Sequence, residues 1–147
     1  MKRNSIVFAE NLAYLRTLDP GQFRLIYIDP PFNTGKTQKR DRFKASACEN
    51  GSRSGFAGRT YSIQKLESPT YEDSFDDFMA FLEPRFHEAY RLLADDGSFF
   101  LHLDYREVHY AKVMLDGIFG RESFMNEIIW AYDYGARSKR KWPAKHD

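Results

Sequence analysis

The sequence has little cysteine, no long apolar run and almost no net charge. Its single cysteine, Cys48, excludes an internal disulfide and a cysteine-based metal cluster. No apolar stretch is long enough for a transmembrane helix, and the apolar run near the amino terminus is interrupted by Glu10 and too short for a signal sequence. The chain has 22 Lys or Arg against 21 Asp or Glu, so it is not a polycation as a whole. We therefore expect a cytoplasmic protein with no membrane segment and no metal.

What is present predicts one folded domain with an uneven charge distribution. The 147 residues are 42% hydrophobic and 16% aromatic, which suffices for one modest core. Residues 36–65 contain eight basic and two acidic side chains, whereas residues 69–96 contain two basic and eight acidic ones. The stretch RSKRK at residues 137–141 adds four cations. Such local clusters of charge can indicate a binding surface even when the net charge of the chain is near zero.

Hydrophobic periodicity predicts strands that alternate with helices. We expect strands at residues 5–8, 25–28, 98–103 and 127–131, and helices at residues 11–18, 74–93 and 106–119. Asn11 and Ser74 are the expected N-caps, Pro84 is expected to kink its helix, and Gly120 follows the last one. Residues 25–28 are expected to form a buried parallel strand. Residues 33–70 are polar and basic and contain glycines, so we expect one long loop there. The fold class predicted is α/β.

The stretch LIYIDPPFNTGKTQ, residues 25–38, permits two chemical interpretations. Gly35-Lys36-Thr37 suggests a phosphate-binding loop. Such a loop needs a glycine five positions earlier, however, and Pro30 stands there. Two consecutive prolines also remove backbone N–H donors that a phosphate would need. The phosphate interpretation is therefore disfavoured.

The second interpretation is a site for an exocyclic amine. Two acceptors on the N–H bonds of a nucleobase amine draw its nitrogen toward tetrahedral geometry and free its lone pair. The Asp29 carboxylate provides one acceptor, and the carbonyl of Pro30, fixed by the proline ring, can provide the other. Phe32 offers a flat face for an extruded base. The site follows a strand, where open α/β sheets bind ligands. The simpler alternative, an Asp-Pro turn without chemistry, stays open.

Asp29-Pro30-Pro31-Phe32 after LIYI resembles the catalytic motif of amino-group DNA methyltransferases of the beta type. The segments NLAYLRTLDPGQFRLIYIDPPFNTGK and LADDGSFFLHLDYREVHYAKVMLDGIFGRESFMNEIIW are similar to that group, which includes the modification subunits of type III restriction systems. The resemblance implies an open, mostly parallel, Rossmann-like sheet. It also implies methyl transfer from S-adenosylmethionine (AdoMet) to a flipped adenine in double-stranded DNA, with Asp29, Pro30, Pro31 and Phe32 as catalytic residues.

The resemblance also assigns binding residues and partners. Asp29 and Asn33 are expected to face AdoMet. Cations expected to contact DNA phosphates are Lys36, Lys39, Arg40, Arg42, Lys44, Arg137, Lys139, Arg140 and Lys141. A solvated charged face is the alternative for these cations. A restriction subunit is a possible partner in such systems.

In that group a target-recognition region and a Phe-x-Gly-x-Gly motif follow the catalytic motif. Neither has a counterpart in residues 1–147, and Phe56-Ala57-Gly58 lacks the second glycine. We therefore expect the amino-terminal part of a methyltransferase domain, lacking the carboxyl-terminal half of the fold. A non-catalytic half that needs a partner chain to bind AdoMet is the alternative, and a protein or small-molecule amine as acceptor is another. The four histidines are expected to be structural or exposed, and Asp104 to cap the helix that follows it or to face the cleft.

Overall fold

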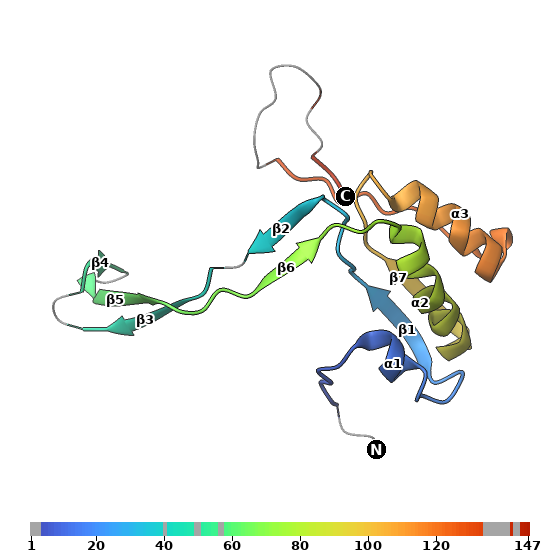
Figure 1. Cartoon of the computed structure of the whole chain (residues 1–147), viewed down its shortest axis with the longest axis horizontal. Helices are drawn as coiled ribbons and strands as arrows, with labels where there is room; N and C mark the ends of the chain where they lie inside the picture. The colour runs from blue at the N-terminus through green and yellow to red at the C-terminus, as the bar shows by residue number, and fades with distance from the viewer. Residues whose placement is uncertain (1–3, 40, 49–50, 56–57, 134–141, 143–144) are drawn as a thin grey trace. The chain divides into compact units, whose positions relative to one another are not determined.

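The structure is a computed structural model that describes residues 4–39, 41–48, 51–55, 58–133, 142 and 145–147. It divides into two compact units (Figure 1). Unit 1 comprises Met1–Asn33 and Phe75–Asp147, and unit 2 comprises Thr34–Ser74. Each unit is described by itself below.

Two parallel strands form the sheet of unit 1. Strand β1 (Phe23–Ile28) pairs with β7 (Leu93–Leu101), so that Ile26 lies opposite Phe99 and Ile28 opposite Leu101. Parallel neighbours need a crossover connection, and helix α2 precedes β7 directly. The predicted parallel strand at residues 25–28 is confirmed. The prediction that it is buried is wrong, because one face of β1 is uncovered in the described chain and Leu25 is 61% exposed.

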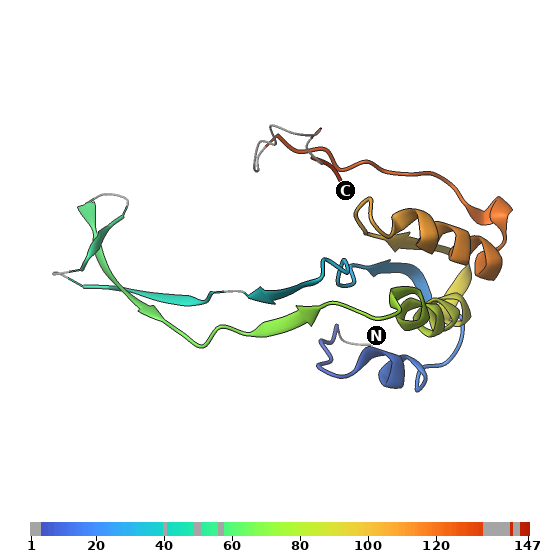
Figure 2. The same cartoon turned by 45° about the horizontal axis from the view of Figure 1, so that its top comes forward.

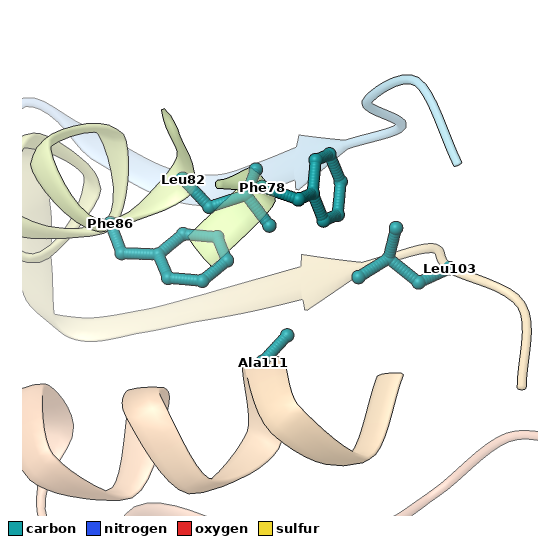
Figure 3. Close-up of a cluster of buried hydrophobic side chains, with 5 residues drawn as sticks. All are labelled: Phe78, Leu82, Phe86, Leu103 and Ala111. Carbon is teal, nitrogen blue, oxygen red and sulfur yellow. The ribbon is translucent and has the colours of Figure 1, made fainter. Parts of the chain in front are cut away.

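Helix α2 (Phe78–Leu92) supplies most of the core. Its buried side chains recur every three or four residues and are Phe78, Leu82, Phe86, Ala89 and Leu92. Figure 3 shows the first three pointing toward Leu103 and Ala111. The predicted helix is confirmed, but its N-cap is wrong. Asp77, not Ser74, accepts the N–H of Ala80. Pro84 lies inside the helix.

Helix α3 (Val108–Phe119) follows β7 and packs against the same core. Ala111 is fully buried, and Val108, Leu115 and Ile118 contact the cluster. Gly120 ends the helix with φ of +88° and donates its N–H to Asp116, a conformation that glycine adopts without strain. A short 3₁₀ helix, η2 (Arg121–Ser123), comes next.

Helix α1 (Asn11–Leu15) is shorter than predicted and has another cap. Glu10, not Asn11, is the N-cap, and its carboxylate accepts the N–H of Ala13 at 2.8 Å. Arg85 of α2 donates to Glu10 and to Asn11, and its guanidinium lies 3.7 Å from the centre of the Phe81 ring. These contacts attach α1 to α2.

Two predicted strands do not form. Residues 5–8 are irregular and have no strand partner in the described part of the chain, and Ile6 and Phe8 are fully exposed. Residues 127–130 are also irregular, and only Ala131 makes an isolated antiparallel bridge, to His146. Apolar residues of high strand propensity form a strand only where a neighbouring strand accepts their backbone hydrogen bonds. Among the described residues the first segment meets no such edge. The second meets one only at its end, where Trp130 exchanges two backbone hydrogen bonds with Asp147 and the Tyr132 N–H donates to Lys145.

Unit 2 overturns the prediction of a long loop. The strands among its described residues, all antiparallel to their partners, are β2 (Lys36–Lys39), β3 (Phe43–Ala47), β4 (Arg53–Ser54), β5 (Thr60–Lys65) and β6 (Thr70–Asp73). Strand β2 pairs with β6, and β5 lies between β3 and β4 (Figure 2). The sequence is polar because these strands expose both faces, so it lacks the apolar alternation of a half-buried strand.

The protein is thus of mixed α/β class, with a parallel pair in one unit and antiparallel pairs in the other. None of the described helices has the length and apolar character needed to cross a bilayer.

Candidate functional site

The candidate site lies where the two parallel strands of unit 1 end. Asp29 and the two prolines follow β1, and His102 to Asp104 follow β7. The backbone N–H of His102 donates to the carbonyl oxygen of Ile28 at 3.0 Å. The two strands are therefore still hydrogen-bonded to each other at the residue before Asp29. The carboxyl ends of parallel strands are the usual location of ligand sites in open α/β sheets.

Asp29 presents its carboxylate to solvent and to a histidine. The side chain is 56% exposed, and Oδ1 lies 3.5 Å from Nδ1 of His102. That distance is slightly longer than an ordinary N–H···O hydrogen bond. The carboxylate therefore has a polar neighbour on one side and free acceptor capacity on the other, as an amine ligand requires.

Pro30 and Pro31 are half-buried and, with Asp29, line a cavity of about 550 Å³ within unit 1. Its remaining walls are mainly aliphatic and aromatic side chains of β1, α1 and α2, among them Tyr27 and Phe81. A volume of this size suits a small organic ligand. The lining also includes the polar side chains of Asn11 and Arg85, so a mainly apolar cavity with the Asp29 carboxylate in its wall suits a ligand that has a flat apolar part and an N–H donor.

Phe32 is half-buried and contacts both the core and His102. It packs against the cluster of Phe78, Leu82 and their neighbours. Its ring also meets the His102 ring edge-on, with centroids 5.3 Å apart and planes at 73°. The ring position is therefore determined by the fold before any ligand binds.

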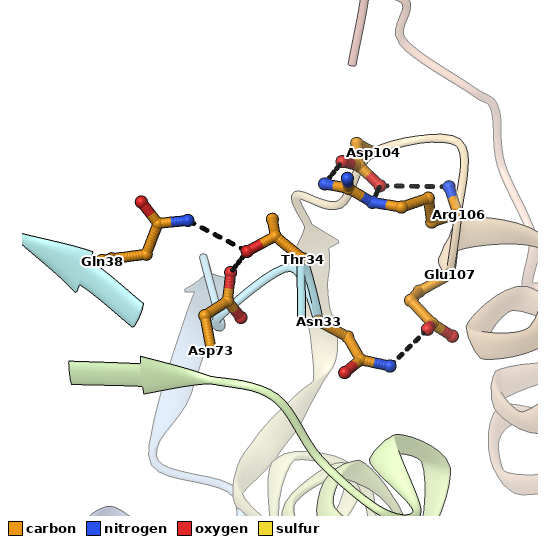
Figure 4. A network of polar contacts seen from close by, with 7 residues as sticks. All are labelled: Asn33, Thr34, Gln38, Asp73, Asp104, Arg106 and Glu107. Carbon is orange, nitrogen blue, oxygen red and sulfur yellow. Dashed lines mark hydrogen bonds and ion pairs between the residues drawn. The ribbon is translucent and has the colours of Figure 1, made fainter. Parts of the chain in front are cut away.

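Asn33 lies at the end of the loop that follows β1, and its side chain fixes the position of that end. Its φ of +53° belongs to the left-handed region, which asparagine tolerates better than most residues. Nδ2 donates to Oε1 of Glu107 at 2.7 Å (Figure 4). Oδ1 accepts the N–H of Phe75 at 3.2 Å. Both ends of the amide are thus used within unit 1. A role for Asn33 in cofactor binding stays a prediction.

Asp104 is 6% exposed and lies in the turn before α3, but it is not the N-cap that the capping interpretation expected, because Glu107 occupies that position. Its carboxylate accepts the backbone N–H of Arg106 at 3.0 Å and pairs with the Arg106 guanidinium (Figure 4). Its carbonyl accepts the N–H of Val108, the first residue of α3. The side chain reaches the turn before α3 rather than the helix itself, and Glu107 at the N-cap position makes no side-chain cap.

In unit 2, a buried carboxylate holds the first strand pair together. Asp73 is 1% exposed, and its Oδ2 accepts the hydroxyl of Thr34 at 2.5 Å, which in turn accepts Nε2 of Gln38 (Figure 4). The Gly35 N–H donates to the carbonyl of Asp73 at 2.8 Å. The Gly35-Lys36-Thr37 stretch is therefore a strand start, not a phosphate cradle.

Four of the cations predicted to contact DNA lie in the described part of unit 2: Lys36, Lys39, Arg42 and Lys44. All four are exposed. Asp41 partly offsets this charge, because it lies 3.1 Å from the Lys65 ammonium and 3.9 Å from that of Lys39. The Ser68 hydroxyl and the Lys65 ammonium hold the pKa of Asp41 below its ordinary value, so this acid is charged at neutral pH.

The other predicted cations, Arg40, Arg137, Lys139, Arg140 and Lys141, lie outside the described residues, as do Phe56 and Ala57. Across the ranges that the structure describes, no group of three or more His, Cys, Asp or Glu side chains could hold a metal ion.

Sequence reasoning missed the residues that support the motif from neighbouring elements. His102, Tyr27 and Glu107 contact Asp29, His102 and Asn33 respectively. For His102, one signal is present in the sequence: two parallel strands must end side by side, so the residues after SFFL and after LIYI are natural neighbours. A lone histidine near a strand favours a structural interpretation instead, and that interpretation omits the contact with Asp29.

Comparison with known proteins finds similarity to DNA methylases and to restriction-modification enzymes. The model of the family described as DNA methylase matches residues 23–147. The StyLTI Mod subunit, a type III restriction-modification enzyme of Salmonella typhimurium, is 30% identical over 132 residues, which are 86% of this chain and 20% of that protein. The probable type III HindVI Mod subunit of Haemophilus influenzae is 34% identical over 130 residues, covering 85% and 13% respectively. The type II methyltransferase M.KpnI of Klebsiella pneumoniae is 27% identical over 148 residues, covering 98% and 31%. The chain thus spans less than a third of the length of these relatives.

Proposed function

The chain belongs to the DNA methylase family, and we propose that it transfers a methyl group from AdoMet to the exocyclic amine of an adenine flipped out of duplex DNA. The observation that carries the proposal is the position of Asp29. Its carboxylate is exposed, follows a parallel strand, precedes two half-buried prolines and borders a cavity of about 550 Å³.

Asp29 has the properties of an amine acceptor. It accepts one N–H of the base, while the Pro30 carbonyl accepts the other. The nitrogen then becomes more tetrahedral, and its lone pair leaves the ring system. When the N–C bond forms, positive charge develops on the nitrogen, and a carboxylate in contact with it stabilises that charge. The same carboxylate can take the proton that the amine loses.

The negative charge of the Asp29 carboxylate is the feature of this site that suits AdoMet. When bound, AdoMet supplies a methyl group on a positively charged sulfur, which keeps the electron pair of the broken C–S bond. A cation of this kind is favoured next to the Asp29 carboxylate. The apolar walls beside Asp29 suit the rest of such a ligand. We propose Asp29 as a cofactor-facing residue, and a cofactor contact of Asn33 stays a prediction.

We propose that Phe32 stacks on the extruded base. Its ring is held by the core and by His102, so little conformational entropy remains to be lost when the base arrives. Base–aromatic stacking contributes about 1–3 kcal/mol per base.

Contacts to the DNA backbone are proposed for Lys36, Lys39, Arg42 and Lys44. Their exposure and the basic excess of residues 36–65 support this. Phosphate contacts would position the duplex but not read its sequence. The slope of log affinity against log salt decreases in magnitude by about 0.9 for every phosphate that a protein no longer neutralises. Replacing Lys36 and Lys44 by alanine should therefore flatten the salt dependence by nearly two units.

The whole protein is proposed to have further parts. We infer that the parallel pair with its helices belongs to an open, Rossmann-like sheet, and that residues 1–147 form its catalytic-motif part. Target recognition would lie elsewhere, and a restriction subunit would be a partner, as the names of the Mod relatives suggest. We propose the cytoplasm as its site of action.

A labelled-methyl assay tests the proposal. The chain is incubated with AdoMet carrying a labelled methyl group and with duplex DNA, in competition with an unrelated protein as methyl acceptor. Asp29→Ala should abolish labelling of DNA and leave DNA affinity nearly unchanged. Asp96→Ala is the matched control, because Asp96 is an exposed carboxylate within β7 that pairs with Arg24. Label that appears on the protein competitor instead of DNA, or activity that survives Asp29→Ala, contradicts the proposal.

A further inference from the structure

His102 touches two of the residues that are proposed to meet the base, and it does so from a different strand. Its ring faces the carboxylate of Asp29 on one side and the ring of Phe32 on another. Its backbone N–H is bonded to the last residue of β1, so its own position depends on the pairing of β1 with β7. Tyr27 also reaches the histidine, from the strand that precedes Asp29. His102 therefore links the carboxylate and the aromatic ring of the motif to the neighbouring strand.

The two ring nitrogens of His102 have different environments. Nδ1 lies 3.5 Å from Oδ1 of Asp29 and 3.2 Å from the Tyr27 hydroxyl. Nε2 is buried and has no hydrogen-bond partner within the described part of the chain. A neutral imidazole carries its proton on only one nitrogen.

This asymmetry determines where the proton is best placed. A proton on Nε2 would be a buried donor without an acceptor, which is unfavourable. A proton on Nδ1 has the Asp29 carboxylate and the Tyr27 hydroxyl oxygen as acceptors. A hydrogen bond to one nitrogen fixes the tautomer of the ring in this way. The Nδ1–H form therefore satisfies the one proton of the ring.

We propose that His102 is a positioning residue: its Nδ1–H orients the Asp29 carboxylate, and its ring edge holds Phe32, so that both are set before the base arrives. The role given to His102 rests on the proposed methyl transfer, whereas its contacts with Asp29, Phe32 and Tyr27 are observed in the structure. An acceptor held in place needs no reorganisation at the moment of reaction. Substrate is not expected to touch His102 itself.

The tautomer can be measured without any methyl transfer. Nitrogen NMR of the full chain, labelled at its histidine rings and at a pH where imidazole is neutral, distinguishes protonated from unprotonated ring nitrogens. We expect Nδ1–H for His102 in the unmodified chain. In Asp29→Ala the Tyr27 hydroxyl oxygen remains as an acceptor, so we expect the proton to stay on Nδ1 and the Nδ1 resonance to shift because the neighbouring carboxylate is lost. An Nε2–H tautomer in the unmodified chain, or no change on removing Asp29, overturns the proposal.

Two variants separate the contact of Nδ1 with the Asp29 carboxylate from the contact of the His102 ring with Phe32. His102→Asn keeps an N–H donor close to the position of Nδ1 but loses the ring. His102→Phe keeps a ring against Phe32 but has no donor. Misplacement of a reacting group by a fraction of an ångström can cost a large factor in rate. We expect His102→Phe to lower kcat by about tenfold or more with KM for DNA nearly unchanged, and His102→Asn to stay within about threefold.

A purely structural role predicts the reverse order, with His102→Phe tolerated and His102→Asn impaired, and that order overturns the proposal. The NMR result decides independently if either variant fails to fold. An unmodified chain that shows the Nδ1–H tautomer and the shift of the Nδ1 resonance in Asp29→Ala, yet transfers no methyl group to DNA, contradicts the proposed function and not the contact.

Discussion

The Asn33 side chain donates to Glu107 across 74 residues of sequence, with Nδ2 only 2.7 Å from Oε1. This bond joins the loop after β1 to the start of α3. Asp29 and Phe32 lie between that anchor and the end of the strand, so the motif is held at both ends. The conformation of the proposed acceptor site therefore depends on residues outside the motif.

Replacing Asn33 by aspartate should weaken this anchor. The variant keeps an acceptor for the Phe75 N–H but places a second carboxylate against Glu107. We expect the free energy of unfolding in urea to fall by about 1–2 kcal/mol, because a hydrogen bond to a charged group is replaced by repulsion. Adding Glu107→Gln should restore much of the loss. Additive effects of the two substitutions would show that the residues do not interact.

Arg85 should stabilise unit 1 through its fork of donors. It donates to Glu10, to Asn11 and to the carbonyl of Phe81, on whose ring it also stacks. Lysine keeps the charge but not the planar fork. Arg85→Lys should therefore lower the free energy of unfolding by about 1–2 kcal/mol in urea denaturation. Arg24→Lys, at an exposed pair with Asp96, is the control and should change little. Equal effects at both positions would contradict this account.

The attachment of α1 should weaken in acid. The N–H groups of Ala13 and Leu12, and then the charge of Arg85, lower the pKa of Glu10 below its ordinary value of 4.5. A carboxyl with a lowered pKa in the folded state stabilises that state fully above 4.5, and loses this effect as the pH falls through the folded value. We expect the stability difference between the unmodified chain and Glu10→Gln to shrink below pH 4.5. Urea midpoints measured over a pH series check this, and a constant difference would contradict it.

Phe86 should be the most sensitive core position. It is fully buried in the cluster that joins α2 to α3 and β7. Phe86→Ala leaves a cavity, and we expect a loss of about 3–5 kcal/mol in the free energy of unfolding. Phe8→Ala is the control, since Phe8 is fully exposed and should contribute less than about 0.5 kcal/mol. A similar loss for both would mean that the core is placed elsewhere.

Parts of the fold with strong local signals were predictable from the sequence. The apolar spacing of α2 and α3 and the glycine after α3 mark two helices, and the short apolar run before Asp29 marks the parallel strand. The strands of unit 2 were not predictable, because both faces are exposed and their partners lie up to 37 residues away, as between Lys36 and Asp73. The apolar residues at 127–131 predicted a strand, but strand formation also needs a neighbouring edge.

Of the candidate site, only the Asp29-Pro30-Pro31 stretch was predictable from the sequence. The position of Asp29 after a strand follows from the local sequence, as does its pairing with two rigid prolines. The contact with His102 depends on the register of β1 against β7, which no local pattern determines. Likewise, the hydrogen bond from Asn33 to Glu107 is a tertiary contact that the local sequence does not indicate, and the ligand role expected of Asn33 came from the resemblance alone.

The most direct measurement is the identity of the methylated nucleoside. Duplex DNA treated with this chain and AdoMet is digested to nucleosides and analysed by mass spectrometry, beside the same reaction with Asp29→Ala. The account predicts N6-methyldeoxyadenosine with the unmodified chain and none with the variant. Methylated cytosine, or an equal yield of methyladenine from Asp29→Ala, would contradict it.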